Sequence, residues 1–273
     1  MTPIKTTDLK TMKERDQKIT VLTAYDTPTA RIFDRAGIDV ILVGDTLGMV
    51  VLGFDTTLPV SMEDMVRHTR AVVRGAERAL IVADMPFLSY QVSVPEAVRN
   101  AGRLIQEGGA AAVKFEGGKP VLDVARRLVE IGIPVMGHLG MTPQSVHRFG
   151  GFRMQAKTED AAAALLEDAR ALEEAGAFAI VLESIPDNVA AEVTTSLTIP
   201  TIGIGAGPFC DGQVLVSHDI LGLGGYVPPF AKQYANLTEI ISRAATEYAR
   251  EVREGVFPAP RKAEPAAKGA KEE

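Results

Sequence analysis

The chain contains few of the residues on which several classes of protein depend. Among its 273 residues there is one cysteine, no tryptophan and only 4 histidines, and aromatic residues make up 5%. The lone thiol, Cys210, cannot form an internal disulfide, and no cysteines and histidines have the spacing of a zinc site. If the protein binds a metal ion, oxygen ligands should therefore hold it.

Long hydrophobic runs are also missing. The longest apolar runs, such as residues 79–83 and 177–182, have about five or six residues, whereas a helix that spans a bilayer needs roughly 20. Residues 1–20 carry charges throughout and contain no apolar stretch that could act as a signal sequence. The sequence predicts a protein that does not enter a membrane and that stays in the cytoplasm.

Positive charge is neither in excess nor clustered. The chain has 29 Lys+Arg against 35 Asp+Glu, a formal net charge of -6, and no block of five basic residues. Affinity for a phosphate backbone depends on clustered positive charge. We therefore expect no nucleic-acid partner.

Short runs rich in Val, Ile and Leu alternate along the chain with amphipathic helical stretches. Continuous apolar runs are typical of parallel strands that are buried on both faces. We expect strands at residues 20–24, 40–43, 79–83, 111–115, 134–136, 179–182, 201–204 and 214–216. Eight such units without a long linker favour a single-domain (β/α)8 TIM barrel. An open doubly wound sheet is the alternative that fits the same pattern.

The composition changes only near the C-terminal end. Residues 258–273 are mostly Pro, Ala, Lys and Glu and contain no large apolar side chain. Such a segment cannot bury enough surface to offset the entropy lost on ordering. We predict a catalytic barrel domain over residues 1–257 and a disordered tail over residues 258–273.

Ionisable side chains stand at the ends of five consecutive predicted strands. They are Asp45, Asp84, the pair Lys114 and Glu116, His138 and Glu183. Any one of them could be only a helix cap or a turn former. Because the C-terminal ends of all strands in a barrel meet at one mouth, five in a row indicate a shared functional site.

Three of these residues, Asp45, Asp84 and Glu116, could hold a hard divalent cation. Mg²⁺ binds carboxylate oxygens, keeps several waters and leaves room for a chelating substrate. A 2-oxo acid can chelate through its carboxylate and keto oxygens, and the metal then stabilises the enolate formed when the adjacent carbon loses a proton. The pattern therefore predicts Mg²⁺ and a 2-oxo acid.

The other three residues suit the same chemistry. Lys114 lies two residues before Glu116 on one strand, hence on the same face, and could neutralise the substrate carboxylate. Glu183 is the candidate base, because apolar neighbours such as Ile180 would raise its pKa toward neutrality. His138 could hydrogen-bond a substrate oxygen or act as a second acid or base; a structural role is the alternative.

The segments around these strand ends carry a further signal. Residues 43–49 read Val-Gly-Asp-Thr-Leu-Gly-Met, and residues 136–145 read Met-Gly-His-Leu-Gly-Met-Thr-Pro-Gln-Ser. Further stretches are residues 22–26, 83–87, 113–118, 203–207 and 210–216. Taken in order, they resemble the ketopantoate hydroxymethyltransferase family from residue 22 to residue 216.

The resemblance implies a (β/α)8 barrel that binds one Mg²⁺ per subunit and transfers a hydroxymethyl group from 5,10-methylenetetrahydrofolate to 2-oxoisovalerate. The product, ketopantoate, serves pantothenate and coenzyme A synthesis. Members are often decamers, so the resemblance also implies a homo-oligomer. Thr46 stands where the family usually has serine, and we expect the shared hydroxyl to preserve function.

By motif position, the resemblance implies that Asp45 and Asp84 bind the metal and that Glu116 completes its site directly or through water. Lys114 would bind the substrate carboxylate, and Glu183 would accept the proton. The residues expected to contact the substrate are Asp45, Thr46, Asp84, Lys114 and His138.

Two other functions fit parts of the pattern. One is a Mg²⁺-dependent phosphoenolpyruvate or isocitrate lyase-like barrel, but the chain has no Lys-Lys-Cys-Gly-His loop, since its one cysteine lies in Phe209-Cys210-Asp211. The other is a non-catalytic barrel that binds a metabolite. The complete set of acidic and basic residues at the strand ends argues against it.

Overall fold

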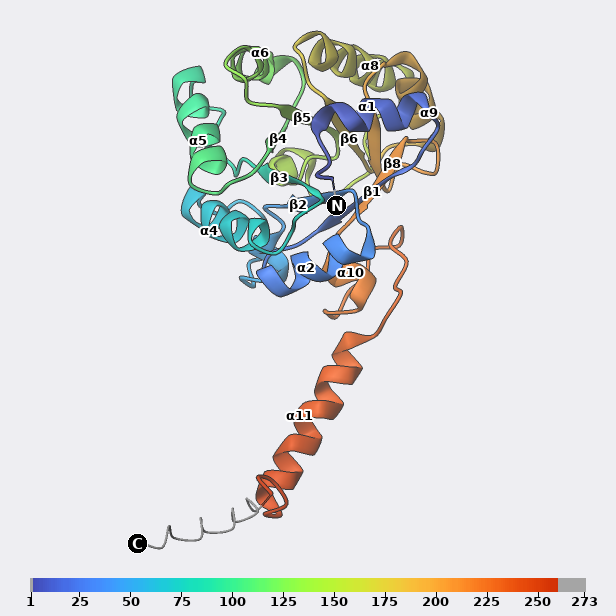
Figure 1. Cartoon of the computed structure of the whole chain (residues 1–273). Helices are drawn as coiled ribbons and strands as arrows, with labels where there is room; N and C mark the ends of the chain where they lie inside the picture. Colours follow the sequence, from blue (N-terminus) through green and yellow to red (C-terminus); the bar gives the residue numbers. More distant parts are fainter. Residues whose placement is uncertain (1, 260–273) are drawn as a thin grey trace, which may run out of the picture.

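The structure, a computed structural model, describes residues 2–259, and residues 260–273 of the predicted tail lie outside the described part. Eight parallel strands form a closed barrel in which each strand pairs with its neighbours in sequence and β8 pairs with β1 (Figure 1). The predicted (β/α)8 barrel is confirmed, and the open-sheet alternative is excluded because that pairing closes the sheet.

All eight predicted strands are present. Their bounds are β1 Ile19–Thr23, β2 Val40–Val43, β3 Leu80–Asp84, β4 Ala112–Glu116, β5 Val135–Gly140, β6 Ala179–Glu183, β7 Thr201–Ile204 and β8 Gly212–Leu215. The last strand begins two residues before the predicted start at Val214. Gly212 and Gln213 are not apolar, but their backbones pair with both β7 and β1. Pairing rather than hydrophobicity therefore decides where β8 begins.

Helices follow most strands and cover the outside of the barrel (Figure 1). The α-helices are α1 Thr6–Glu14, α2 Thr27–Ala36, α3 Leu47–Val50, α4 Met62–Val73, α5 Val94–Gln106, α6 Leu122–Glu130, α7 Val146–Phe149, α8 Glu159–Glu174, α9 Asp187–Ser196, α10 Ser217–Leu221 and α11 Leu237–Arg253. Two 3-10 turns, η1 Lys119–Val121 and η2 Pro143–Ser145, precede α6 and α7. Local capping sets several helix starts; the Ser61 hydroxyl, for example, accepts the Asp64 N–H at the start of α4.

The strands divide the apolar side chains into two layers. Alternate residues such as Val82, Ala112 and Val181 pack inside the barrel, whereas Val113 and Phe115 pack between the strands and the helices. At the N-terminal end of the barrel, α1 inserts Leu9 into the inner layer. Helix α1 therefore covers the N-terminal end of the barrel, opposite the end where the strands finish.

Asp34, near the end of α2, fixes the segment that leads into β3. Its carboxylate accepts hydrogen bonds from the backbone N–H groups of Glu77, Arg78 and Ala79, at 3.0, 3.0 and 2.7 Å. Burial alone would raise the pKa of Asp34, but these three hydrogen bonds and the charge of Arg78 together lower it. The ionised carboxylate therefore stabilises the folded chain.

We expect Asp34→Ala to lower the free energy of unfolding by about 2 kcal/mol, because three partly buried donors lose their acceptor. Urea unfolding at neutral pH measures this, with Asp123→Ala on α6, whose side chain is 85% exposed, as the control. Since folding lowers this pKa, the stabilisation is present above the unfolded-state pKa and is lost as the pH falls through the folded-state pKa. A difference between wild type and variant that persisted in strong acid would contradict the assignment.

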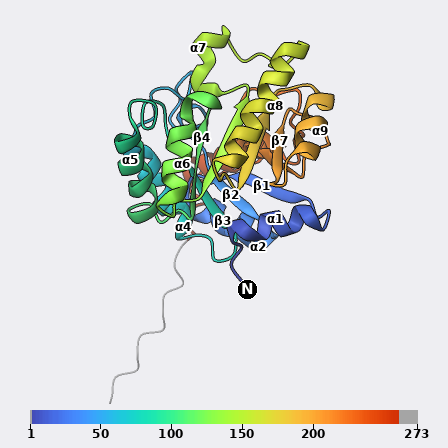
Figure 2. The same cartoon turned by 90° about the horizontal axis from the view of Figure 1, so that it is seen from above.

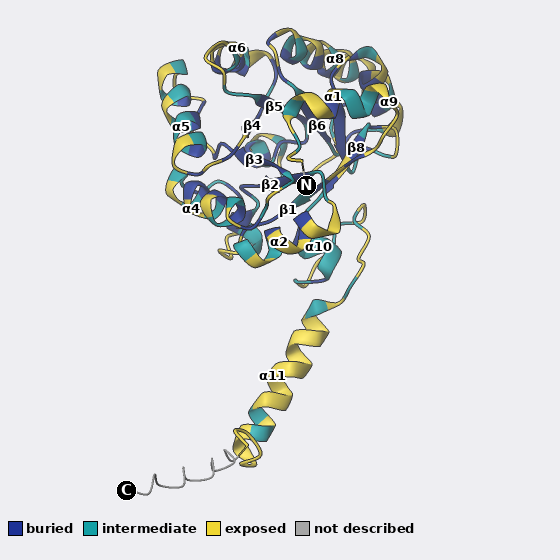
Figure 3. Ribbon diagram, viewed as in Figure 1, coloured by how far each residue is buried: buried dark blue, intermediate teal, exposed yellow. Residues whose placement is uncertain are grey.

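Helix α11 lies apart from the barrel. It runs away from the barrel body in Figure 1, and Figure 3 shows that most of its surface is exposed. None of its residues is buried. Among residues 2–259, no helix combines the length and the apolar character needed to cross a membrane.

Candidate active site

The polar side chains on the inner face of the barrel lie at its mouth, at the C-terminal ends of the strands. Asp84 follows Val82 on β3, and Lys114 follows Ala112 on β4, each two residues further along the strand. In the barrel register Asp84 lies opposite Lys114, and Glu116 lies opposite His138. These side chains therefore project into one space from neighbouring strands.

All seven predicted site residues line one small cavity at this mouth. They are Asp45, Thr46, Asp84, Lys114, Glu116, His138 and Glu183. The cavity measures about 40 Å³, whereas one water occupies about 30 Å³. It has room for an ion or a water, and a whole 2-oxo acid would have to extend from it toward the mouth.

Lys114 and Asp84 form a buried ion pair in the lining of this cavity. The Lys114 Nζ atom lies 2.9 Å from Asp84 Oδ1, and the other oxygen of Asp84 accepts the Asp45 backbone N–H at 3.1 Å. Burial lowers the pKa of Lys114, but the charges of Asp84, Glu116 and Asp45 outweigh it and the pKa is raised. Lys114 therefore remains an ammonium group.

Gln144, which was not among the predicted site residues, joins two of the carboxylates. Its side-chain amide donates to Asp45 Oδ2 at 2.8 Å and to the Met85 carbonyl at 2.9 Å, and its backbone N–H donates to Glu116 Oε2 at 2.9 Å. Tyr90, also missed, donates to Gln144 Oε1 at 2.7 Å. The only feature of the sequence that could have pointed to Gln144 is the position of its amide side chain, two residues after Thr142 in the segment that follows β5. Side-chain length and direction, which no pattern shows, place Gln144 between the carboxylates.

His138 lies between Lys114 and Glu183. Its Nδ1 atom is 3.3 Å from Lys114 Nζ, and its Nε2 atom is 3.0 Å from Glu183 Oε2. Burial and the charge of Lys114 hold the pKa of His138 well below its usual value, so the ring is neutral. Because an ammonium group can only donate, Nδ1 is assigned as the acceptor and the proton to Nε2, which faces Glu183. His138 Nε2 makes no hydrogen bond of regular geometry, although Glu183 lies close to it.

Three carboxyl groups of the cavity have raised pKa values. Burial, followed by the charge of Asp84, raises the pKa of Asp45 to about 7. Burial, followed by the charge of Asp45, raises the pKa of Glu116 well above its usual value. Burial also raises the pKa of Glu183 to about 7, and the nearby charge of Lys114 only partly offsets this. Negative charge in the cavity is therefore poorly compensated.

These residues suit a divalent cation. Asp84 Oδ1 is buried and makes no hydrogen bond of regular geometry, despite its closeness to Lys114. Asp45, Asp84, Glu116 and Glu183 face the single ammonium of Lys114. Within residues 2–259, no three His, Cys, Asp or Glu side chains are arranged to hold an ion as they stand. A cation bound here would need water or substrate oxygens as further ligands, as Mg²⁺ commonly does.

The barrel and the buried acid–base cluster at its mouth define a (β/α)8-barrel enzyme. Residues 3–260 match the Ketopantoate hydroxymethyltransferase family. The chain belongs to this family.

Relatives named 3-methyl-2-oxobutanoate hydroxymethyltransferase support this membership. The relative from Dehalococcoides mccartyi is 59% identical over 92% of this chain and 90% of its own length. The relative from Moorella thermoacetica is 59% identical over 92% of this chain and 93% of its own length. The relative from Thermoanaerobacter sp. is 54% identical over 93% of both chains. The chain is thus an enzyme of the transferase class, with a role in pantothenate synthesis.

Solved structures show where the fold recurs. A phosphonopyruvate hydrolase complex with oxalate and Mg²⁺ matches with a TM-score of 0.60 and 14% identity, over 97% of this chain and 92% of that chain. A 2,3-dimethylmalate lyase, described as a member of the PEP mutase/isocitrate lyase superfamily, matches with a TM-score of 0.59 and 16% identity, over 94% of this chain and 88% of that chain. At such identity the likeness shows the fold alone, so it does not support the lyase alternative over the transferase.

Proposed function

We propose that the enzyme transfers a hydroxymethyl group from 5,10-methylenetetrahydrofolate to 2-oxoisovalerate, with one Mg²⁺ per subunit, and so forms ketopantoate. The observation that carries this proposal is one buried cluster that combines excess carboxylates, an ammonium group and a separate glutamate. The names of the relatives specify the acceptor and the transferred group. The folate donor and the metal rest on the family resemblance and on the chemistry of the cluster.

Lys114 binds and orients the acceptor in this proposal. Two of its three N–H donors face Asp84 and His138, which leaves one for the substrate carboxylate. The Thr46 hydroxyl lines the same cavity and can hydrogen-bond the substrate. Asp45 and Asp84 would hold the cation, with Glu116 as a direct or water-mediated ligand. Bound there, a divalent cation supplies Lewis acidity that favours negative charge on the keto oxygen.

Glu183 removes the C3 proton of the acceptor. Its pKa of about 7 makes it an effective base near neutral pH. Neutral His138 lies beside Glu183, with Nε2 3.0 Å from Glu183 Oε2. Glu183 then holds the proton until a product group accepts it.

The overall transfer consumes one water. A bond forms between C3 of the acceptor and the one-carbon unit, and the water oxygen becomes the hydroxyl group of the product. Both C–N bonds of the donor methylene break, and their electron pairs return to the two nitrogens. The C3 proton and one proton of water complete these nitrogens, so atoms and charge balance.

An NMR assay of deuterium exchange at C3 of 2-oxoisovalerate tests the proposal. We expect wild-type protein to catalyse exchange with Mg²⁺ even without folate, and to form ketopantoate only when 5,10-methylenetetrahydrofolate is added. Removing Mg²⁺ with a chelator should stop both reactions. Cleavage of a 2-oxo acid skeleton would favour the lyase, and binding without exchange would favour the non-catalytic barrel.

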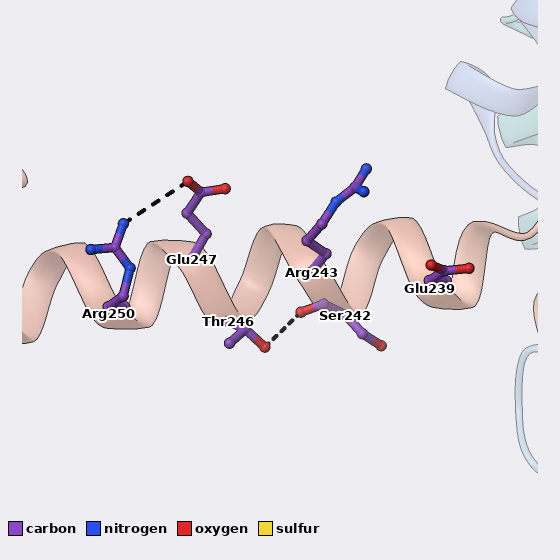
Figure 4. Close-up of a pocket in the computed structure, with 6 residues that line it drawn as sticks. All are labelled: Glu239, Ser242, Arg243, Thr246, Glu247 and Arg250. Carbon is purple, nitrogen blue, oxygen red and sulfur yellow. Dashed lines mark hydrogen bonds and ion pairs between the residues drawn. The ribbon is translucent and has the colours of Figure 1, made fainter.

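We also propose that the protein is a homo-oligomer, and α11 supports this. Its side chains Ile240, Ile241, Tyr248 and Val252 are 48%, 53%, 59% and 45% exposed. A separate, polar side is drawn in Figure 4, where Arg250 pairs with Glu247 and the Thr246 hydroxyl donates to the Ser242 carbonyl. An amphipathic helix with both sides in water is stabilised when a second copy covers the apolar side.

Light scattering checks the oligomer. We expect wild-type protein to have a mass that is a multiple of 29.1 kDa, and Ile241→Arg on the apolar side to reduce it. Thr246→Arg on the polar side is the matched control and should leave the mass unchanged. A monomeric wild type would contradict the proposal. The ten subunits implied by the resemblance, the cytoplasmic location and the absence of a nucleic-acid partner stay predictions.

A further inference from the structure

A second, larger cavity adjoins the carboxylate cluster. Its volume is about 540 Å³, within the range of about 300–1,000 Å³ that is typical of small-molecule sites. Its walls come from the segments that follow β3, β4 and β5, and from the start of α8. In Figure 2, α7 and the start of α8 lie at the end of the barrel opposite the N-terminus.

Glu116 connects this large cavity with the small one, because it lines both. Gln144 forms another part of the boundary: it lines the large cavity and donates to Asp45 in the small one. A molecule in the large cavity therefore lies one side chain away from the acceptor. That closeness is what a second substrate needs when its carbon must join the C3 carbon of the first.

The walls of the large cavity suit a flat aromatic ring system. Phe87, Tyr90, Leu139, Phe149 and Leu165 supply apolar and aromatic surface. The lining also includes two residues with side-chain amides, Gln91 and Gln155. A planar heterocycle with polar edges can stack on such walls while its nitrogens and oxygens pair with the amides.

Two charged side chains of the cavity, Arg148 and Asp168, would orient a bound molecule. The Arg148 guanidinium lies over the Phe149 ring, with Cζ 5.9 Å from the ring centroid, and Arg148 is exposed at the rim. Asp168 is partly buried and accepts the Lys119 backbone N–H through Oδ1. Gly118 permits this contact, because a Cβ there would overlap the Asp168 carboxylate. Donor groups of a heterocycle suit Asp168, and an anionic tail suits the exposed Arg148.

We infer that this cavity is the site of the one-carbon donor, a reduced pterin whose ring stacks on the aromatic wall that includes Phe87 and Phe149 and whose carboxylate tail reaches Arg148. The inference rests on the proposed function, since it assigns a place to the folate of that reaction. The ring would enter from the α7 side, and its one-carbon unit would point to the Glu116 end, where the two cavities meet.

Two neighbouring alanines of α8 provide a matched test. Ala164 lines the cavity, whereas Ala163 does not, and both are exposed. We expect Ala164→Trp to fill the cavity and to raise KM for 5,10-methylenetetrahydrofolate by at least about tenfold, equivalent to roughly 1.4 kcal/mol of binding. Deuterium exchange of 2-oxoisovalerate without folate should stay unchanged. Ala163→Trp should alter neither quantity.

Arg148→Met tests the tail contact without filling the cavity. It should raise KM for the folate and leave exchange intact, and Arg126→Met on the exposed side of α6 is its control. Unchanged KM in both Ala164→Trp and Arg148→Met would overturn the inference. So would loss of exchange in both variants, because the cavity would then serve the acceptor. Failure of the proposed function itself is distinguishable, since wild-type protein would then neither exchange C3 nor form ketopantoate.

Discussion

Glu183→Gln should reduce the rate of deuterium exchange at C3 of 2-oxoisovalerate by at least about 100-fold, the usual range for loss of a general base. Glutamine has nearly the same shape and keeps an amide oxygen that can take the place of the carboxylate oxygen 3.0 Å from His138 Nε2. The substitution therefore removes the base and preserves its surroundings. NMR measures exchange, and calorimetry of 2-oxoisovalerate binding should show little change in Kd.

The pH dependence of exchange gives an independent check on Glu183. Only the ionised carboxylate can accept a proton, and burial raises its pKa to about 7. The wild-type rate should therefore rise with pH through neutrality and level off above about pH 8. Glu192→Gln, on the exposed side of α9, is the matched control and should behave as wild type. Near-normal exchange by Glu183→Gln would refute the assignment of the base.

Asp84→Ala should weaken Mg²⁺ binding by more than about tenfold, or roughly 1.4 kcal/mol. Asp84 contributes a buried oxygen without a regular hydrogen bond and lies next to Asp45, so its loss removes both a ligand and negative charge from the cavity. Titration calorimetry with MgCl2 measures the change without depending on activity. A titration curve equal to that of wild type would remove Asp84 from the ligand set.

The same substitution should also affect stability. Asp84→Ala leaves the Lys114 ammonium buried without its partner at 2.9 Å, which costs about 3–5 kcal/mol in comparable pairs. Asp84→Asn separates the loss of metal affinity from the loss of stability in part, because its amide oxygen can still accept the Asp45 backbone N–H. Both variants should lose metal affinity, and Asp123→Ala should lose neither affinity nor stability.

The apolar runs predicted eight strands, and their number without a long linker favoured a closed barrel over an open sheet that fits the same runs. Inside a barrel a strand must be apolar on both faces, so runs such as residues 40–43 and 179–182 stand out in the sequence. Strand β8 was located less well, because Gly212 and Gln213 join the sheet through their backbones and carry no hydrophobic signal. Helix α11 was not among the segments singled out, and the structure shows that it lies outside the barrel with none of its residues buried.

The sequence alone also determined which ionisable groups meet at the mouth, because parallel strands of a barrel bring their ends together wherever they stand in the chain. Only the tertiary structure decided how those groups interact: that Lys114 pairs with Asp84, that His138 is neutral between Lys114 and Glu183, and that Gln144 joins Asp45 to Glu116. The position of a strand in the barrel sets where the backbone of its last residue lies. Contacts of a few ångströms depend on side-chain rotamers, and pKa values depend on burial, and both arise only when all eight strands close around the same space.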